Sequence, residues 1–321
     1  MSARAAGRRS VATSRRTRIV GAFFEQLCRL LTVLTCTALI AVLAVIIVKG
    51  IGVIDLEFLT GAPTEGMTAG GIFPAIFGTI CITLLMILMA LPLGVAAAIY
   101  LVEYAGKGLA PRIIRAAVNN LAGVPSIVFG LFGVGFFILF VGRNLDRVLQ
   151  TGLLFGQPAM LWAAATLAIL VLPVVIVSTE EALRAVPASH REAAFALGAT
   201  PWQVVQQTVL PQAYPGILTG AILSVSRGAG ETAPILFTGC AYFLPRLPVS
   251  EFFGIPMINP LDQFMELSYH IFIMVTQSTD AAATRPIQYG TTLVLVALTF
   301  LLNMAAILTR NRFRRRAEAL L

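Results

Sequence analysis

The chain has 321 residues, of which 58% are hydrophobic and only 12% charged. This balance excludes a water-soluble globular domain, in which roughly 25% of residues are charged, and indicates that the bilayer is the solvent. The net charge of +8 gathers mainly at the two ends of the chain, where it bears on membrane topology. We therefore expect membrane lipid around the chain and no nucleic acid partner.

The cysteines and histidines show no pattern that predicts a metal site. The two histidines lie far apart, and the cysteines lie in or beside apolar runs without paired or metal-ligand spacing: Cys28, Cys36, Cys81 and Cys240. We interpret the cysteines as small apolar residues and expect neither a disulfide nor bound zinc.

The N-terminal segment 1–24 contains six arginines among small and polar residues. Such a composition cannot bury a core, so we predict a flexible basic arm near anionic lipid headgroups on the cytoplasmic side. The apolar run that follows, Leu30 to Val48, is too long for the core of a signal peptide and is not followed by a small-residue cleavage site. It is predicted to be the first membrane span.

We predict an all-α polytopic membrane protein with six transmembrane helices, because six apolar runs each approach the roughly 20 residues needed to cross a bilayer. The spans cover residues 30–48, 73–102, 121–141, 159–177, 217–239 and 289–308. They form a permease domain over residues 25–310, with an outer loop at 240–288, and a basic cytoplasmic tail follows at 311–321.

The distribution of positive charge orients these spans. With a cytoplasmic N-terminus, 17 of the 23 Lys and Arg residues fall on the cytoplasmic side, as the positive-inside rule requires. Both termini and the segment 179–213 are then cytoplasmic. A further apolar run, Phe264 to Gln277, is short and carries Glu266 and His270, so we expect an interfacial helix on the outer surface instead of a seventh span.

Internal prolines are predicted to kink several spans: Pro74, Pro92, Pro125, Pro173 and Pro234. Kinks are common in membrane proteins, but this many favours a bundle around a moving pathway. Near the third span, Asn119 and Asn120 precede a Gly- and Pro-containing stretch, which indicates a helix break around residues 123–126. That break could line a pathway or could be a kink with small packing residues.

The polar stretch from Ser189 to Pro211 stands out between apolar spans. We predict a first short helix capped by Ser189 and Glu192 and stopped by Gly198. A second is predicted to begin after Thr200, with Pro201 at its first position, and to end at Pro211. The result is a compact cytoplasmic knob.

Opposite charges occur together in the fifth predicted span, where Arg227 and Glu231 lie four residues apart, with Ser224 one turn earlier. Each charge costs roughly 2.5–3.5 kcal/mol at the centre of a span, whereas their pairing returns only about 0.2–0.5 kcal/mol. Charges within membrane spans are usually functional, so we predict that Arg227, Glu231 and Ser224 line the substrate pathway. The guanidinium would meet an anion in transit, and Glu231 would hold it when the site is empty or accept a proton from the passing ion. An interhelical ion pair that fixes the register of the bundle is the alternative.

The sequence lacks a Gly-rich phosphate loop, a GxSxG motif and an HExxH motif. We therefore expect a non-catalytic chain that binds no cofactor and takes energy from a partner or an ion gradient.

The polar stretch resembles the EAA loop of ABC importer permeases of the MetI-like, type I family. The residues that carry the resemblance are Glu192, Ala193, Ala194, Gly198, Leu210 and Pro211; Thr208 departs from it, standing where the family usually has an aliphatic residue. NLAGVPSIVFGLFG at 120–133 and SRGAGETAPILFTG at 226–239 look like phosphate permeases, and GETAP points to the PstA type. The resemblance covers residues 70 to 310.

The resemblance implies a permease subunit that imports inorganic phosphate across the bacterial inner membrane. Its implied partners are a second permease (PstC type), an ATPase dimer (PstB type) that uses ATP and Mg, and an extracytoplasmic phosphate-binding protein (PstS type). The EAA residues would form the coupling helix that docks on the ATPase. Open alternatives are another oxyanion, the PstC-type subunit, or an ion-coupled secondary transporter with Glu231 as its proton site; an intramembrane enzyme lacks a credible nucleophile and base.

Overall fold

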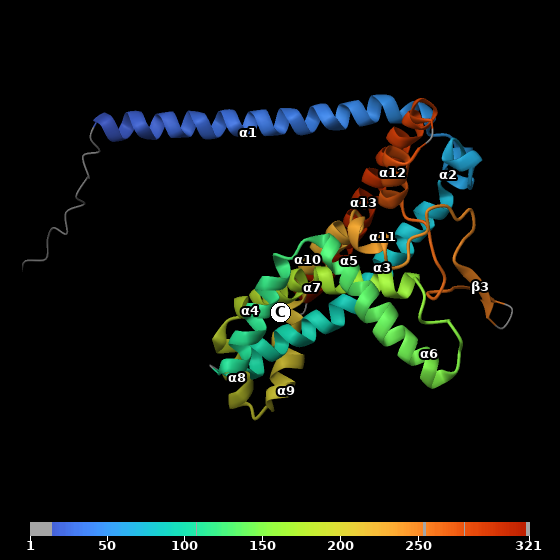
Figure 1. Ribbon diagram of the computed structural model, residues 1–321. Coiled ribbons are helices and arrows are strands. Elements are labelled where there is room, and N and C mark those ends of the chain that lie inside the picture. Colours follow the sequence, from blue (N-terminus) through green and yellow to red (C-terminus); the bar gives the residue numbers. More distant parts are fainter. Residues whose placement is uncertain (1–14, 107, 253–254, 279, 319–321) are drawn as a thin grey trace, which may run out of the picture. The chain divides into compact units, whose positions relative to one another are not determined.

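The computed structural model describes residues 15–106, 108–252, 255–278 and 280–318 (Figure 1). Its first part comprises α1 (Arg15–Gly50), η1 (Ile51–Val53), α2 (Leu56–Thr60), β1 (Pro63–Thr64), η2 (Glu65–Met67), β2 (Ala69–Gly70), α3 (Phe73–Ile99), η3 (Tyr100–Tyr104), α4 (Leu109–Ala122), α5 (Ser126–Phe132), η4 (Gly133–Gly142) and α6 (Arg143–Leu149). It continues with α7 (Met160–Ala185), α8 (Ala188–Ala196), α9 (Pro201–Gln203), η5 (Val204–Val209), α10 (Leu210–Gly228), α11 (Ala233–Leu236), β3 (Val249–Phe252), β4 (Ile255–Ile258), α12 (Leu267–Thr276) and α13 (Ala281–Glu318). The strands form two antiparallel hairpins, β1 with β2 and β3 with β4.

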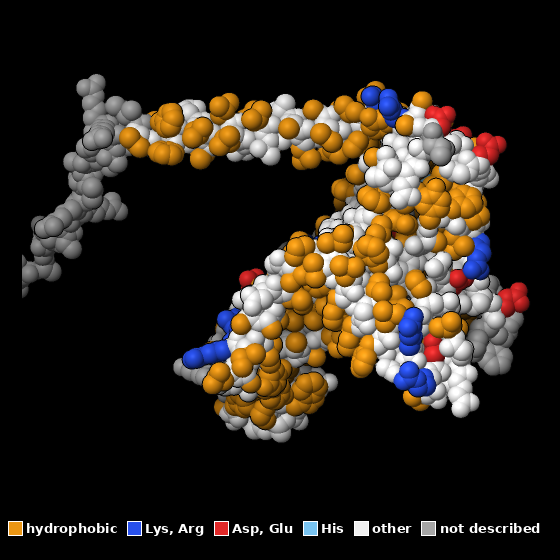
Figure 2. Space-filling model, in the orientation of Figure 1, with side chains coloured by type: hydrophobic (Ala, Val, Ile, Leu, Met, Phe, Trp, Pro, Cys, Tyr) orange, Lys and Arg blue, Asp and Glu red, His pale blue; other side chains and the backbone are white. Residues whose placement is uncertain are grey.

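Helix α1 belongs to a separate unit that ends at Lys49. Apolar side chains cover it on the face that Figure 2 shows, as expected of a helix whose solvent is lipid. It begins at Arg15, inside the segment 1–24 that was predicted to be a flexible arm, and residues 1–14 lie outside the described part of the chain. At the other end, α13 extends into the predicted tail as far as Glu318.

Five of the six predicted spans are helices long and apolar enough to cross a membrane, among the residues described: 20–53, 73–104, 126–149, 160–185 and 281–312. The fifth predicted span, 217–239, is not one helix, because α10 ends at Gly228 and α11 begins only at Ala233. The third begins later than predicted, at Ser126, since Leu121 belongs to α4. The predicted break at residues 123–126 is confirmed.

The prolines act in two different ways. Pro74 lies in the first turn of α3, Pro125 caps α5 and Pro234 lies in the first turn of α11, so all three mark helix starts, where a missing N–H costs nothing. The prediction of kinks was therefore wrong for these three. Pro92 and Pro173 lie inside α3 and α7, as predicted.

The core of the second unit is built around α7, which packs against both α3 and α10. Small side chains allow this close approach: Ala163, Ala164 and Ala168 of α7 are buried. Gly220 of α10 lies so near α7 that a Cβ there would be 1.8 Å from the Ser178 hydroxyl oxygen. Helix α10 also packs against α13, so α10 lies between two long helices.

The run from Phe264 to Gln277 forms the ten-residue helix α12, too short to be a further span. It packs against α13 and α3. Leu267, Tyr269 and His270 are buried, whereas Phe272 and Val275 are 41% and 62% exposed, so one face of this helix packs into the folded core. Its short length was predicted, but its burial was not.

Asp146 organises the loop that follows α6. Its carboxylate is buried and accepts hydrogen bonds from the backbone N–H groups of Leu154, Phe155 and Gly156 at 3.1, 2.9 and 2.6 Å. It also accepts one from the Thr151 hydroxyl at 2.7 Å. One side chain thus satisfies three backbone donors that the loop leaves without partners of its own.

We predict that Asp146→Ala lowers the free energy of unfolding, because three backbone N–H groups lose the acceptor that holds the loop. The measurement is the thermal unfolding midpoint of the detergent-solubilised protein. Arg147→Ala on the exposed side of the same helix is the control. An unchanged midpoint for the Asp146 variant would contradict this account of the loop.

Candidate functional site

The end of α10 places the two predicted charges together. The helix stops at Gly228, and the chain turns through Ala229 and Gly230 before α11 begins. The Arg227 Nε lies 3.5 Å from the Glu231 Oε1, and the two side chains are 39% and 21% exposed. The structure therefore brings Arg227 and Glu231 into an ion pair at a helix break, and the guanidinium remains accessible.

Ser224 does not join this pair. Its side chain is fully buried, and its hydroxyl donates to the Gly220 carbonyl oxygen at 2.9 Å within α10. A hydroxyl satisfied by its own helix backbone offers little to a ligand. The predicted third member of the pathway group therefore lies apart from the accessible guanidinium.

Behind the break lies a polar chain that the sequence did not reveal. The Thr232 hydroxyl donates to the Ser268 Oγ at 2.8 Å, and the Ser268 hydroxyl donates to the Glu266 Oε2. The same carboxyl oxygen accepts from the Tyr269 backbone N–H at 2.8 Å, so Glu266 caps α12. The only signal in the sequence was the Glu266 carboxyl in an apolar run. Thr232 and Ser268 are 36 residues apart, so their contact could not be predicted without the fold.

The EAA residues lie on α8, as predicted. Glu192 and Ala193 are exposed, whereas Ala194 and Leu210 pack against a buried cluster beneath the helix that includes Leu183 and Val209. No residue of α8 is fully buried. One side of α8 is therefore open for contact, and the opposite side packs on the buried cluster.

Arg191 fastens α8 to the rest of the bundle. Its guanidinium donates to both carboxylate oxygens of Glu103 in η3, with Nη2 to Oε1 at 2.8 Å and Nε to Oε2 at 3.3 Å. It also donates to the backbone carbonyls of Val186 and Leu183 at 2.6 and 2.8 Å. Such a forked, charge-assisted arrangement fixes direction as well as distance. Arg191 thus ties α8 to the ends of two long helices.

The predicted caps of the knob are only partly present. Thr200 and Gln203 form a capping box at α9, and Gly198 has a φ of +85°, so this cap and the glycine stop are confirmed. Ser189 is not a cap, because Pro187 takes the N-cap position and the helix starts at Ala188.

Pro211 does not end the second helix, contrary to the prediction. The Leu210 N–H reaches back to the Val205 carbonyl, so the widened π-helical turn η5 precedes the proline. Such a turn moves aside the carbonyl that the proline ring would strike. The helical path therefore runs on from α9 through η5 into α10, which the predicted compact two-helix knob had excluded.

Large apolar side chains remain exposed on the knob, at the end of α8 and the start of α9. Phe195, Leu197 and Trp202 are 49%, 90% and 54% exposed. Figure 2 shows apolar side chains over the region that Figure 1 labels α8 and α9. Exposed apolar groups next to a rigid helix indicate a protein interaction surface.

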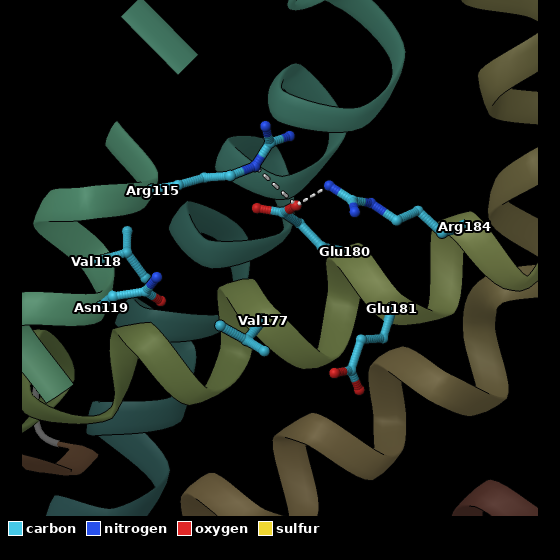
Figure 3. A pocket seen from close by; sticks show the side chains of 7 residues that line it. All are labelled: Arg115, Val118, Asn119, Val177, Glu180, Glu181 and Arg184. Carbon is cyan, nitrogen blue, oxygen red and sulfur yellow. Dashed lines mark hydrogen bonds and ion pairs between the residues drawn. The ribbon is translucent and has the colours of Figure 1, made fainter. Parts of the chain in front are cut away.

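A second charged group lies between α4 and α7 (Figure 3). Arg115 and Arg184 both reach the Glu180 Oε2, at 3.2 and 2.8 Å, whereas Glu181 points away from them. These side chains, with Val118, Asn119 and Val177, line a pocket of about 210 Å³. Asn119, which the sequence placed near a helix break, thus faces this pocket from α4.

Residues 90–318 match the family model described as "Binding-protein-dependent transport system inner membrane component". The "Probable ABC transporter permease protein YqgI" of Bacillus subtilis (strain 168) is 33% identical over 281 residues, covering 84% of this chain and 90% of that protein. The "Phosphate transport system permease protein PstA" of Mycobacterium leprae (strain TN) is 44% identical over 168 residues, covering 52% of this chain and 51% of its own length.

Solved structures show the same fold. A bacterial ABC transporter involved in the import of the acidic polysaccharide alginate has a TM-score of 0.63 at 15% identity, covering 93% of this chain and 99% of that one. The inward-facing MetNI methionine ABC transporter has a TM-score of 0.55 at 18% identity, covering 74% of this chain and 94% of that one. The predicted fold class, an importer permease of the MetI-like type, is confirmed.

We predict that Glu266 contributes stability that is lost as pH rises from about 4.5 to 7. Glu266 lies in the segment between the last two predicted spans, and burial raises its pKa from the ordinary 4.5 to about 7 although several hydrogen bonds lower it. The folded state therefore holds a proton that the unfolded chain releases, and over this window the loss approaches about 3 kcal/mol.

The measurement is the unfolding midpoint of the solubilised protein between pH 5 and pH 8, compared with Glu266→Gln, which cannot titrate. Burial also lowers the pKa of His270 to about 4, so its contribution is lost as pH falls below 6.5. That contribution is common to both proteins and cancels in the comparison. Equal pH slopes in the two proteins would contradict the raised pKa.

Proposed function

Because the chain belongs to the family of inner membrane components of binding-protein-dependent transport systems, we propose that it is the permease subunit of an ATP-driven importer of inorganic phosphate. The observation that carries the choice of an anion is the accessible Arg227 guanidinium at a helix break within an apolar bundle. The relatives named as phosphate permeases support phosphate as that anion.

The ion pair can be exchanged for a substrate at low cost. A partly exposed ion pair such as this one contributes at most about 1 kcal/mol, whereas a hydrogen bond to a charged group contributes about 1.5–3 kcal/mol. A phosphate with several oxygen acceptors can therefore displace Glu231 from Arg227. When the phosphate leaves, Glu231 returns to the guanidinium and keeps it paired.

Glu231 also offers a way to prefer phosphate over sulfate. At neutral pH phosphate retains at least one proton and can donate a hydrogen bond to a carboxylate, whereas sulfate cannot. A carboxylate next to the arginine therefore attracts the first ion and repels the second. A permease for another oxyanion remains the competing proposal, because the relative aligned over most of its length carries no substrate in its name.

The knob is proposed to receive the force of the ATPase. Its exposed residues Glu192 and Ala193 and the apolar side chains beside them would dock on one subunit of an ATPase dimer, where ATP and Mg are used. Arg191 and Glu103 then transmit the movement to α3, and the helix from α9 into α10 transmits it to Arg227. This chain has no catalytic role of its own in the proposal.

The remaining partners follow from the same proposal. A second permease subunit of the PstC type completes the pathway, and an extracytoplasmic phosphate-binding protein of the PstS type docks on the outer side. The knob and both termini are cytoplasmic in this arrangement, as the positive-inside rule predicts. An ion-coupled transporter would need neither the ATPase nor the binding protein.

We predict that Arg227→Ala lowers phosphate uptake by the assembled transporter in proteoliposomes about 10- to 100-fold, the loss expected for one charge-assisted hydrogen bond. Arg227→Lys, which keeps the charge but not the forked geometry, is expected to lose less. Glu231→Gln should narrow the preference for phosphate over sulfate. Normal uptake by the alanine variant, in a complex of normal composition, would contradict the pathway role.

We predict that Gly198→Val separates ATP hydrolysis from uptake, whereas Gly198→Asn keeps them coupled. Among the residues that the structure describes, no atom would meet a Cβ at Gly198, so the strain comes from its φ of +85°, which asparagine tolerates far better than valine. The measurement is the ratio of phosphate transported to ATP hydrolysed. Equal ratios for the two variants would contradict the proposed role of the turn.

A further inference from the structure

Glu266 is a buried carboxyl that the proposed transport steps do not use. Its side chain is only 3% exposed, and it forms no ion pair with the described lysines and arginines. The nearby titratable side chains are Cys240, which interacts with Glu266, and Tyr269, which interacts with Cys240. His270 is buried on α12, the helix that Glu266 caps. Burying a carboxyl is costly unless its hydrogen bonds are made, so its presence needs a reason.

Capping α12 alone does not explain the residue. A cap needs one acceptor for the Tyr269 N–H, which a shorter polar side chain could supply. Glu266 accepts a second hydrogen bond from the Ser268 hydroxyl, and this bond orients the Ser268 oxygen as an acceptor for Thr232. The polar chain thus leads from the buried carboxyl to the helix break.

Helix α3 holds the buried end of this chain. The Thr79 Oγ1 accepts a hydrogen bond from the Leu267 N–H at 3.0 Å. Gly78 of α3 lies so close to Met265, the residue before Glu266, that a Cβ on the glycine would be 1.9 Å from the Met265 carbonyl oxygen. The backbone around Glu266 is therefore fixed against α3, so Glu266 can hold Ser268 and Thr232 in place.

The same helix holds the first end of the break. Gly228 packs on Met86 so closely that a Cβ at the glycine would be 2.2 Å from the Met86 Sδ. The break between Gly228 and Thr232 is thus held at its start by α3 and at its end by the Thr232 hydroxyl. Arg227 and Glu231 lie immediately beside these two points.

We propose that Glu266, acting through Ser268, is a positioning residue that holds Thr232 and thereby sets the distance between Arg227 and Glu231. This inference rests on the proposed function for its effect on transport, but not for its effect on the break. Without the polar chain, Thr232 is released and the second half of the break becomes mobile.

The test is the mobility of a spin label at the break. Gly230 is exposed, and no atom of the described part of the chain lies within 4 Å of a Cβ placed there, so Gly230→Cys is tolerated and reachable. The exposed Cys28 and Cys36 are replaced by serine, whereas Cys81 and Cys240 are buried and are kept. The label is read by electron paramagnetic resonance in the full-length chain within its assembled complex.

Glu266→Ala and Ser268→Ala are each expected to raise the mobility of the label, and the double variant to match either single one, because all three break one chain. Glu266→Gln keeps an acceptor oxygen and should behave as wild type. Glu251→Ala, at an exposed position on β3, is the matched control. Unchanged mobility in Ser268→Ala, a mild substitution that removes only the hydroxyl, overturns the proposal even where the Glu266 variant folds poorly.

Uptake of inorganic phosphate by the same Glu266 and Ser268 variants, in complexes that keep Gly230 and carry no label, separates this inference from the proposed function. Both alanine variants are expected to lose about tenfold in uptake, with Glu266→Gln close to wild type. Raised label mobility with unchanged uptake overturns the positioning role in transport. If the wild-type complex takes up no phosphate, the proposed function fails, and label mobility alone then supports or overturns the hold on Thr232.

Discussion

The rest of the structure depends on the continuous helical path from Pro201 to Gly228, which joins the exposed knob to the Arg227 charge. Its 28 residues cover roughly 40 Å at the rise of an α-helix. Pro211 would interrupt an ordinary helix, but η5 widens the preceding turn and keeps the path intact. A movement of α9 can therefore reach the charged break without passing through a flexible loop.

The path from Pro201 to Gly228 is held against two long helices, α3 and α7. Arg191 ties the knob to Glu103 in η3 and to the end of α7. At the opposite end, Gly228 packs on Met86 of α3, and Thr232 is held through Ser268. The helix that ends at the charged pair is thus in contact with α3 at the break, while the knob is fastened to the η3 segment that continues α3. These contacts favour movement of packed helices over separate motion of loops.

Structural features that depend on a short stretch of sequence could be predicted, whereas contacts between residues far apart in the sequence could not. The apolar spans, the break after Ala122 and the left-handed Gly198 depend on local composition and backbone preference. The pair of Arg191 and Glu103 and the chain from Glu266 to Thr232 need the fold to bring their members together. Ser189 failed as a cap because Pro187 had already set the start of the helix.

The most direct test of this account is the distance between spin labels at Gln206 and Leu223, two exposed positions on either side of Pro211. On a continuous helix they lie roughly 26 Å apart. Double electron-electron resonance is expected to give the same distance in the nucleotide-free and ATP-bound complexes. A change of about 5 Å, one helical turn, would show that the path bends between the labels, where Pro211 and Pro215 lie, and would contradict the rigid connection.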